Sequence, residues 1–227
     1  MITKRLAAPK LWKIPRKVRK FVISPEPGPH TKETSVPLGI VLREYLGVAD
    51  NVKEIKSALS SGSVKVDGKP RKSHRFPIGI MDILEVAGKH YRVSMSPSGF
   101  KLVEISQSDA MKKLLRIKRK VKVKGGKTQY TFHDGRTKIL DEDYKTNSTL
   151  LVSIPNITVM DYYELKEGNY ALITGGNEKG KMGIIKEIKL VRSFMPNRVV
   201  VDTGDEQIET VMDYIFVIGK NKPAIEV

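Results

Sequence analysis

The chain has 227 residues, enough for two or three small modules that each have a modest core. Lysine and arginine number 41 against 25 acidic residues, and the formal net charge of +16 attracts a polyanion, either nucleic acid or an acidic membrane surface. No apolar stretch approaches the roughly 18 residues that span a bilayer. The absence of cysteine excludes disulfides and thiolate-bound metals.

The N-terminal segment is strongly basic. Residues 1–34 hold nine basic and two acidic residues, and Pro25, Pro27 and Pro29 enforce an extended path. Alone, such a segment is too polar to collapse, so we expect it to order along an anionic partner or along its own domains. An organellar transit peptide is less favoured, because Pro9 and Pro15 would interrupt its amphipathic helix.

Two helices are predicted next. Apolar residues recur at helical spacing between 38 and 46, and Gly47 ends that helix. Asp50 is expected to cap a second helix, with Ile55 and Leu59 facing inward.

Short strands and turns follow the helices. Residues 63–66 alternate like a strand and lead into an Asp67-Gly68 turn, and residues 81–86 and 90–93 are predicted as strands around Gly88. Ser106 then begins a short helix with Asp109 in a partial capping box.

The segment from Met111 to His133 is the most polarised part of the chain, with nine basic residues and no acid. Lysines at 118, 120, 122 and 124 alternate with other residues, so a strand would place them in one row on a single face. A solvated strand edge that deters aggregation is the competing interpretation. Nine cations in 23 residues exceed what edge protection needs, so RNA contact is favoured. Tyr130 and Phe132 share a strand face and are expected in the core.

The remainder reads as strands separated by Gly, Pro, Asn or Asp, a pattern that suggests small barrels. The expected strands are 152–154, 157–163, 170–174, 183–191, 198–202 and 208–212.

Two stretches resemble known RNA-associated modules. Residues 50–86, with Gly62-Ser63-Val64-Lys65-Val66-Asp67-Gly68-Lys69 at their centre, resemble the S-four-type or alpha-L RNA-binding motif. Residues 167–185 resemble a KOW motif, a small barrel whose glycine-bearing turn often contacts rRNA or protein. The first resemblance implies a basic edge that can grip phosphates of a folded RNA.

Both modules in this order, behind the basic segment Lys4–Trp12, resemble the small-subunit ribosomal protein family S-four-e of archaea and eukaryotes. Further similar stretches are Gly28-Pro29-His30, Phe76–Asp82, Thr131–Thr137 and Ile215–Pro223. The chain stops soon after Lys222-Pro223, without a long basic tail, which favours an archaeal source. The resemblance implies a cytoplasmic, ribosome-bound structural constituent of the small subunit. Its partners would be rRNA and neighbouring small-subunit proteins, with no catalysis, cofactor, metal, membrane or small-molecule substrate.

The expected fold class is α+β with several modules. These are a basic N-terminal arm (1–36), an alpha-L RNA-binding domain (37–100), a central β-rich domain (101–165), an SH3-like KOW barrel (166–212) and a C-terminal segment (213–227). The expected RNA-binding residues are the cations of these zones: Lys4, Arg5, Lys10, Lys13, Arg16, Lys17, Arg19, Lys20, Lys53, Lys56, Lys65, Lys69, Arg71, Lys72, Arg75, Lys118, Arg119, Lys120, Lys122, Lys124, Lys127, Lys179 and Lys181.

Several features imitate catalytic or metal sites. Gly175-x4-Gly180-Lys181 lacks the Ser or Thr of a nucleotide-binding loop and has Met182 there, and Gly126-Lys127-Thr128 lacks that loop's first glycine, so both are expected to be turns. The four histidines are scattered without metal-ligand spacing, and His133 is expected to be a hydrogen-bonded turn residue. Residues 141–143 are expected to form a solvated acidic loop.

Two questions stay open at this level. Trp12 could stack on a base or anchor the arm against a domain, and the sequence does not decide between them. An RNA-modifying enzyme with the same alpha-L module, or a KOW-type transcription or translation factor, is the alternative function. The enzyme would need a sizeable catalytic domain, and no such motif follows the module.

Overall fold

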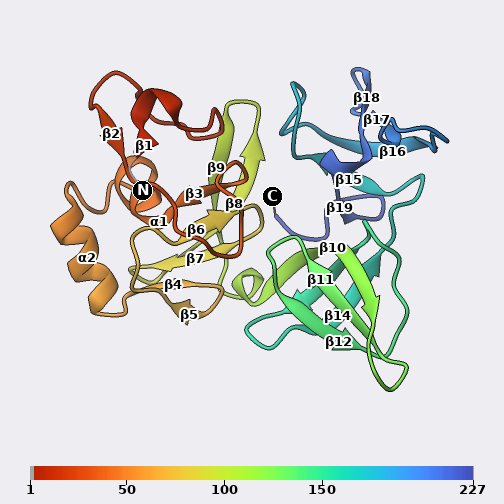
Figure 1. Ribbon diagram of the computed structural model, residues 1–227, viewed down its shortest axis with the longest axis horizontal. Helices are drawn as coiled ribbons and strands as arrows, with labels where there is room; N and C mark the ends of the chain where they lie inside the picture. The colour runs from red at the N-terminus through yellow and green to blue at the C-terminus, as the bar shows by residue number, and fades with distance from the viewer. Residues whose placement is uncertain (1–2, 227) are drawn as a thin grey trace. The chain divides into compact units, whose positions relative to one another are not determined.

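The computed structural model describes residues 3–226 and divides them into two compact units (Figure 1). The N-terminal unit holds residues 3–94 and 98–111, and the C-terminal unit holds residues 95–97 and 112–226. The chain is mostly β-structure with few helices, so the α content is smaller than the expected α+β class suggests. Within the described residues, no helix is long and apolar enough to cross a membrane.

The two predicted helices are confirmed in the N-terminal unit. α1 (Leu38–Ile40) continues into a π-helical turn, η2 (Val41–Tyr45), and α2 spans Val52–Ser60. Ile55 and Leu59 are buried, as the periodicity predicts. The predicted cap is wrong by one residue, because the side chain of Asn51, and not Asp50, accepts hydrogen bonds from the first-turn N–H groups of α2.

The main sheet of the N-terminal unit has the order β5-β4-β7-β8-β9. Its strands are β4 (Val64–Val66), β5 (Lys69–Pro70), β7 (Ile83–Val86), β8 (Lys89–Ser96) and β9 (Gly99–Ile105). The Asp67-Gly68 turn predicted from sequence joins β4 to β5, with φ angles of 51° and 74°. Both values are positive, as a two-residue turn between twisted antiparallel strands requires.

Two small sheets complete this unit. β3 (Ser35–Pro37) pairs with β6 (Pro77–Gly79), and β1 (Thr3–Lys4) pairs with β2 (Phe21–Val22). A short 3-10 turn, η1 (Arg5–Ala7), follows β1. The N-terminal segment therefore belongs to the N-terminal unit, which matches the second of the two expected ways for it to order, along its own domains.

The C-terminal unit holds two five-stranded antiparallel sheets. The first has the order β12-β11-β10-β13-β14, made of β10 (Lys112–Lys122), β11 (Thr128–Phe132), β12 (Thr137–Leu140), β13 (Thr149–Ser153) and β14 (Thr158–Tyr163). Tyr130 and Phe132 are buried on one face of β11, as predicted. These strands supply the surface on which most of the predicted C-terminal cations lie.

The second sheet has the order β18-β17-β16-β15-β19. Its strands are β15 (Tyr170–Ile173), β16 (Met182–Lys189), β17 (Arg198–Asp202), β18 (Gln207–Val211) and β19 (Ile215–Gly219), and a 3-10 turn, η4 (Met212–Tyr214), precedes β19. The six strands predicted between 152 and 212 are confirmed to within about three residues at their ends.

Two predicted boundaries differ from the structure. β9 belongs to the N-terminal sheet and η3 (Asp109–Met111) closes that unit, so the next unit begins at Lys112 and not at 101. β19 pairs with β15, so residues 215–219 complete the C-terminal sheet and do not form a separate tail. Both differences arise because strand pairing is set by partners distant in sequence.

Candidate nucleic-acid interface

Trp12 anchors the N-terminal segment. Trp12 is 1% exposed, and its indole N–H donates a 2.6 Å hydrogen bond to the backbone oxygen of Ser35. A buried indole with a satisfied N–H packs as a core side chain. The structure therefore favours anchoring over base stacking, the question that the sequence left open.

Arg5 is a correction to the predicted site. Its side chain is buried and reaches the Glu44 carboxylate at 3.0 Å and the carbonyl oxygen of Pro15. Burial alone would raise the pKa of Glu44, but contacts with Arg5 and Arg43 outweigh burial and lower it. A guanidinium held in this way is not available to a phosphate, so Arg5 supports the fold.

Three further arginines of the predicted set bind the protein itself. The guanidinium of Arg16 donates to the carbonyl oxygens of Ala8 and Pro9, at 2.8 and 3.0 Å. Arg75 Nε donates to the carbonyl of Ser24 at 3.0 Å, and Arg71 lies over the ring of Phe76 at 4.2 Å. All three are half-buried, and their contacts use part of their capacity for an external partner.

The lysines of the N-terminal unit behave differently. Lys65 is half-buried and paired with Glu85 at 2.9 Å across β4 and β7. The others of the predicted set are exposed, together with Arg19: Lys4, Lys10, Lys13, Lys17, Lys20, Lys53, Lys56, Lys69 and Lys72. A long cationic side chain that extends into solvent can meet a phosphate at little cost in rearrangement.

The hairpin of β10 and β11 carries the densest group of exposed cations. Its strands pair from Ile117↔Phe132 to Lys122↔Thr128, and a β-bulge shifts the register between Ile117 and Arg119. The bulge breaks the alternation, and Lys124 lies beyond the end of β10, so the predicted single row of four lysines is wrong in detail. We name the following exposed cations the hairpin cluster: Lys118, Arg119, Lys120, Lys122, Lys124 and Lys127.

An acidic loop contacts part of the hairpin cluster. Residues 141–143 are exposed, as predicted, but Asp143 contacts Lys120 at 3.0 Å and Asp141 contacts Lys127 at 3.7 Å. The hydrogen bond and charge of Lys120 lower the pKa of Asp143. Lys120 and Lys127 are thus partly neutralised. Across residues 3–226, no ion pair is found for the other four cations of the cluster.

The two cations predicted in the C-terminal sheet lie in the loop between β15 and β16. Lys179 is half-buried, and Lys181 pairs with both Glu178 and Glu206. Hydrogen bonds from Lys181 to these carboxylates raise its pKa to about 12. Lys181 is therefore already balanced by two acids. The loop joins two strands, so the nucleotide-loop resemblance is a hairpin turn, as expected.

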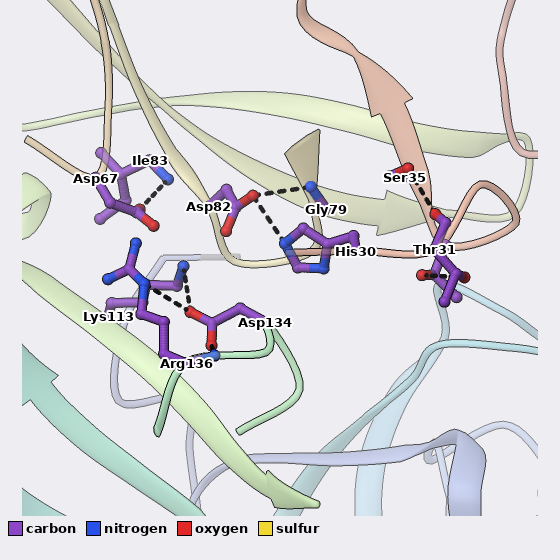
Figure 2. Close-up of polar contacts among 11 residues, drawn as sticks. His30, Thr31, Ser35, Asp67, Gly79, Asp82, Ile83, Lys113, Asp134 and Arg136 are labelled. Atoms are coloured by element: carbon purple, nitrogen blue, oxygen red, sulfur yellow. Dashed lines mark hydrogen bonds and ion pairs between the residues drawn. The ribbon is translucent and has the colours of Figure 1, made fainter. Parts of the chain in front are cut away.

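Buried carboxylates of the N-terminal unit organise its backbone (Figure 2). Asp82 accepts a 2.9 Å hydrogen bond from the N–H of Gly79 and contacts His30 Nε2 at 2.9 Å. Asp67 accepts a 3.0 Å bond from the N–H of Ile83. A side chain at position 79 would collide with the His30 ring, so glycine is required there. These contacts assign His30 and both aspartates structural roles.

Other cations from the basic segment 111–133 are also internal. Lys113 Nζ lies 3.2 Å from Asp134 Oδ2 with both side chains buried, and Arg136 Nε lies 3.3 Å from the same oxygen (Figure 2). Arg116 donates to the carbonyls of Asp213 and Ile215, and burial lowers its pKa. The sequence count of nine cations therefore overstates the charge available to a partner.

His133 lies in the turn after β11. Its Nδ1 accepts a 3.2 Å hydrogen bond from the N–H of Arg116, and its ring packs edge-on against Phe216 at 5.1 Å. These contacts confirm the predicted hydrogen-bonded turn histidine.

One exposed segment was missed by the sequence reasoning. The loop 190–197 between β16 and β17 presents apolar side chains and Arg192 to solvent. The sequence contains a signal for this loop, because Ser193, Pro196 and Asn197 are turn-forming residues around the Phe194-Met195 pair. The loop was not predicted because the strand expected there extended to Val191.

Comparisons with known proteins agree with this description. The family model described as "Ribosomal family S4e" matches residues 87–159, and the RS4NT (NUC023) domain matches residues 3–33. Small ribosomal subunit protein eS4 of Methanocella arvoryzae is 42% identical over 98% of this chain and 96% of its own length. The protein of that name from Archaeoglobus fulgidus is 41% identical with the same coverages.

A solved structure is similar as well. The crystal structure of the 30S ribosomal protein S4e from Thermoplasma acidophilum superposes with a TM-score of 0.73 at 33% identity, covering 82% of this chain and 96% of that one. The S4e family model, the relatives and the solved structure are all described as ribosomal proteins, and this defines the class. Within that class, the chain belongs to the ribosomal S4e family. The sequence resemblance to that family is confirmed.

Proposed function

We propose that the protein is a structural constituent of the small ribosomal subunit that binds rRNA and catalyses no reaction. The relatives that match almost its whole length bear the name of a small-subunit protein. Its partners are then small-subunit rRNA and adjacent ribosomal proteins, and its location is the cytoplasmic ribosome. The RNA-modifying enzyme and the transcription or translation factor gain no support from these relatives.

The observation that carries the RNA-binding part is the hairpin cluster. Lys118, Arg119, Lys122 and Lys124 are exposed, and no acid of the described chain pairs with them. Cations crowded on one hairpin repel one another in the absence of an anion, and RNA phosphates relieve that repulsion while counterions leave the RNA. The cluster therefore suits a phosphate backbone.

Two modules would present the remaining contacts. α2 with the β4–β5 hairpin has the element order of an alpha-L motif and exposes Lys53, Lys56 and Lys69. The sheet β18-β17-β16-β15-β19 contains the KOW-like segment, and we assign it the role of a small KOW barrel. The revised set of proposed RNA contacts comprises Lys4, Lys10, Lys13, Lys17, Arg19, Lys20, Lys53, Lys56, Lys69, Lys72, Lys118, Arg119, Lys120, Lys122, Lys124, Lys127 and Lys179.

Sedimentation tests the ribosomal assignment. A cell extract is centrifuged through sucrose in high magnesium, and the protein is located by antibody. We expect it in the fraction that holds small subunits, released by high salt. Protein that remains at the top of the gradient would refute the assignment.

A salt series tests the RNA contact. Binding to small-subunit rRNA is measured for the protein, for the double variant Lys122→Ala/Lys124→Ala and for a control, Lys101→Ala/Lys220→Ala. Both variants lose two exposed lysines. Each lost phosphate contact makes the slope of log affinity against log salt concentration less negative by roughly 0.7–0.9. The slope should therefore become less negative by about 1.4–1.8 in the hairpin variant and stay unchanged in the control. Equal slopes in all three proteins would remove the hairpin cluster from the interface.

A further inference from the structure

The loop 190–197, here named the β16–β17 loop, exposes an unusual amount of apolar surface. The relative exposures are 72% for Leu190, 111% for Phe194 and 64% for Met195. Single exposed apolar residues are ordinary in soluble proteins. Several exposed apolar residues within one eight-residue loop, including a fully exposed aromatic ring, indicate a surface that binds a partner molecule.

The base of this loop is fixed. Asn197 Oδ1 accepts a 2.9 Å hydrogen bond from the N–H of Val191, and the carbonyl of Asn197 accepts one from Met212. Near the tip, Met195 N–H donates to Ser193 Oγ at 3.2 Å. The base of the loop is thus fixed to the sheet, and the side chains of Phe194 and Met195 at its tip are exposed.

The charge of the segment selects the partner. Residues 188–201 contain Lys189, Arg192 and Arg198 and no acid. Lys189 and Arg198 both contact Glu209 at the base of the loop, at 2.9 and 2.8 Å. Among the residues from 3 to 226, none forms an ion pair or hydrogen bond with the side chain of Arg192. An unopposed cation two residues from an exposed ring complements an anion that carries a flat apolar face.

We propose that the β16–β17 loop binds an unpaired nucleotide of RNA, with the Phe194 ring stacked on the base and Arg192 on an adjacent phosphate. Every base has a π-face, but that face is open to a side chain only outside a continuous helix. The same loop without Arg192 would fit an apolar protein pocket equally well. The positive charge of Arg192 favours RNA as the partner. This inference rests on the proposed rRNA-binding function and adds a contact that the hairpin cluster does not supply.

Fluorescence of a single base tests the contact. The probe is an RNA hairpin with one 2-aminopurine bulge, compared with the same RNA without the bulge. The full-length protein is compared with Phe194→Ala, Phe194→Tyr and a control, Met160→Ala, which removes another exposed apolar side chain of the same unit. Because the Phe194 side chain is fully exposed, its substitution leaves the fold intact, and unchanged hydrogen exchange in β16 and β17 of the same unit verifies this.

We expect Phe194→Ala to bind the bulged RNA about tenfold more weakly and to abolish the change in 2-aminopurine emission. Phe194→Tyr keeps a stacking ring and should retain both, as should Met160→Ala. Equal binding by the protein and Phe194→Ala would overturn the inference. So would a loss of subunit incorporation with RNA binding unchanged, which would assign the loop to a protein partner.

The salt series separates this inference from the function beneath it. If the protein binds rRNA with a steep salt slope while Phe194→Ala has no effect, only the loop contact fails. If neither rRNA nor bulged RNA is bound and the hairpin variant changes nothing, the proposed function fails.

Discussion

At the scale of single residues, arginine and lysine serve different ends in this protein. Arg5, Arg16 and Arg75 bind carbonyl oxygens of the N-terminal segment or its surroundings, whereas most lysines of the predicted set extend into solvent. A guanidinium has several donors in a fixed plane and can satisfy backbone oxygens that a lysine would leave unpaired. From sequence alone, both residue types are predicted as phosphate contacts, because a count of charges does not show which group each side chain contacts.

Arg5 offers a direct test. Arg5→Ala leaves the Pro15 carbonyl without its donor and Glu44 with Arg43 alone, so unfolding free energy should fall by about 2–4 kcal/mol. Urea denaturation followed by Trp12 emission measures this, since Trp12 is the single tryptophan and lies in the same unit. Exposed Lys4→Ala is the control and should change it by less than about 0.5 kcal/mol.

The same pair predicts a pH dependence. The pKa of Glu44 is lowered from its ordinary value of 4.5, so its contribution to stability is complete above that value and is lost as the pH falls through the folded pKa. The difference between the protein and Arg5→Ala should therefore be largest near pH 7 and narrow below about pH 4. A difference that stays constant with pH would show that the carboxylate has no part in it.

At the scale of elements, local signals predicted local structure. Helical spacing located α1 and α2, and Asp67-Gly68 located the turn between β4 and β5. Features set by distant residues were not predictable, namely the bulge after Ile117 and the pairing of β19 with β15. Each depends on a packing partner that the local pattern does not name.

The cap of α2 can be checked by substitution. Asn51 Oδ1 accepts from the N–H groups of Lys53 and Glu54, at 2.9 and 3.0 Å. Asn51→Ala should therefore lower unfolding free energy by about 1 kcal/mol, measured by denaturant titration. Asp50→Ala should have a clearly smaller effect, and the reverse order would restore Asp50 as the cap.

The acidic loop gives the hairpin cluster an internal competitor. Asp143→Asn removes the carboxylate charge that holds Lys120, so we expect rRNA affinity to rise about two- to fivefold at low salt and less at high salt. Asp205→Asn removes an equal charge from an exposed turn residue and controls for net charge. Filter binding measures both, and equal gains would mean that only total charge matters.

At the scale of the whole molecule, the two units have separate cores. Leu38, Ile55 and Leu84 are buried in the N-terminal unit, and Leu114 and Ile185 in the C-terminal unit. The family resemblance predicted the class of protein correctly, because it used the order of several motifs along nearly the whole chain. It could not predict where one unit stops, since β9 crosses the boundary expected between residues 100 and 101.

Separate cores predict separate unfolding. Ile185→Ala removes buried volume from the C-terminal unit and should destabilise that unit by about 2–5 kcal/mol. The Trp12 transition in urea should stay in place, while hydrogen exchange in β15–β17 becomes faster. A matching shift of the Trp12 transition would contradict independent units.

The division between lysine and arginine also separates two chemistries that a modifying reagent can tell apart. An acylating reagent selective for amines would erase most of the exposed positive charge and leave the guanidinium contacts of Arg5, Arg16 and Arg75 in place. A dicarbonyl reagent selective for guanidinium would find Arg19, Arg119 and Arg192 exposed. The attraction of this protein for polyanions can therefore be titrated away while the architecture that carries it persists.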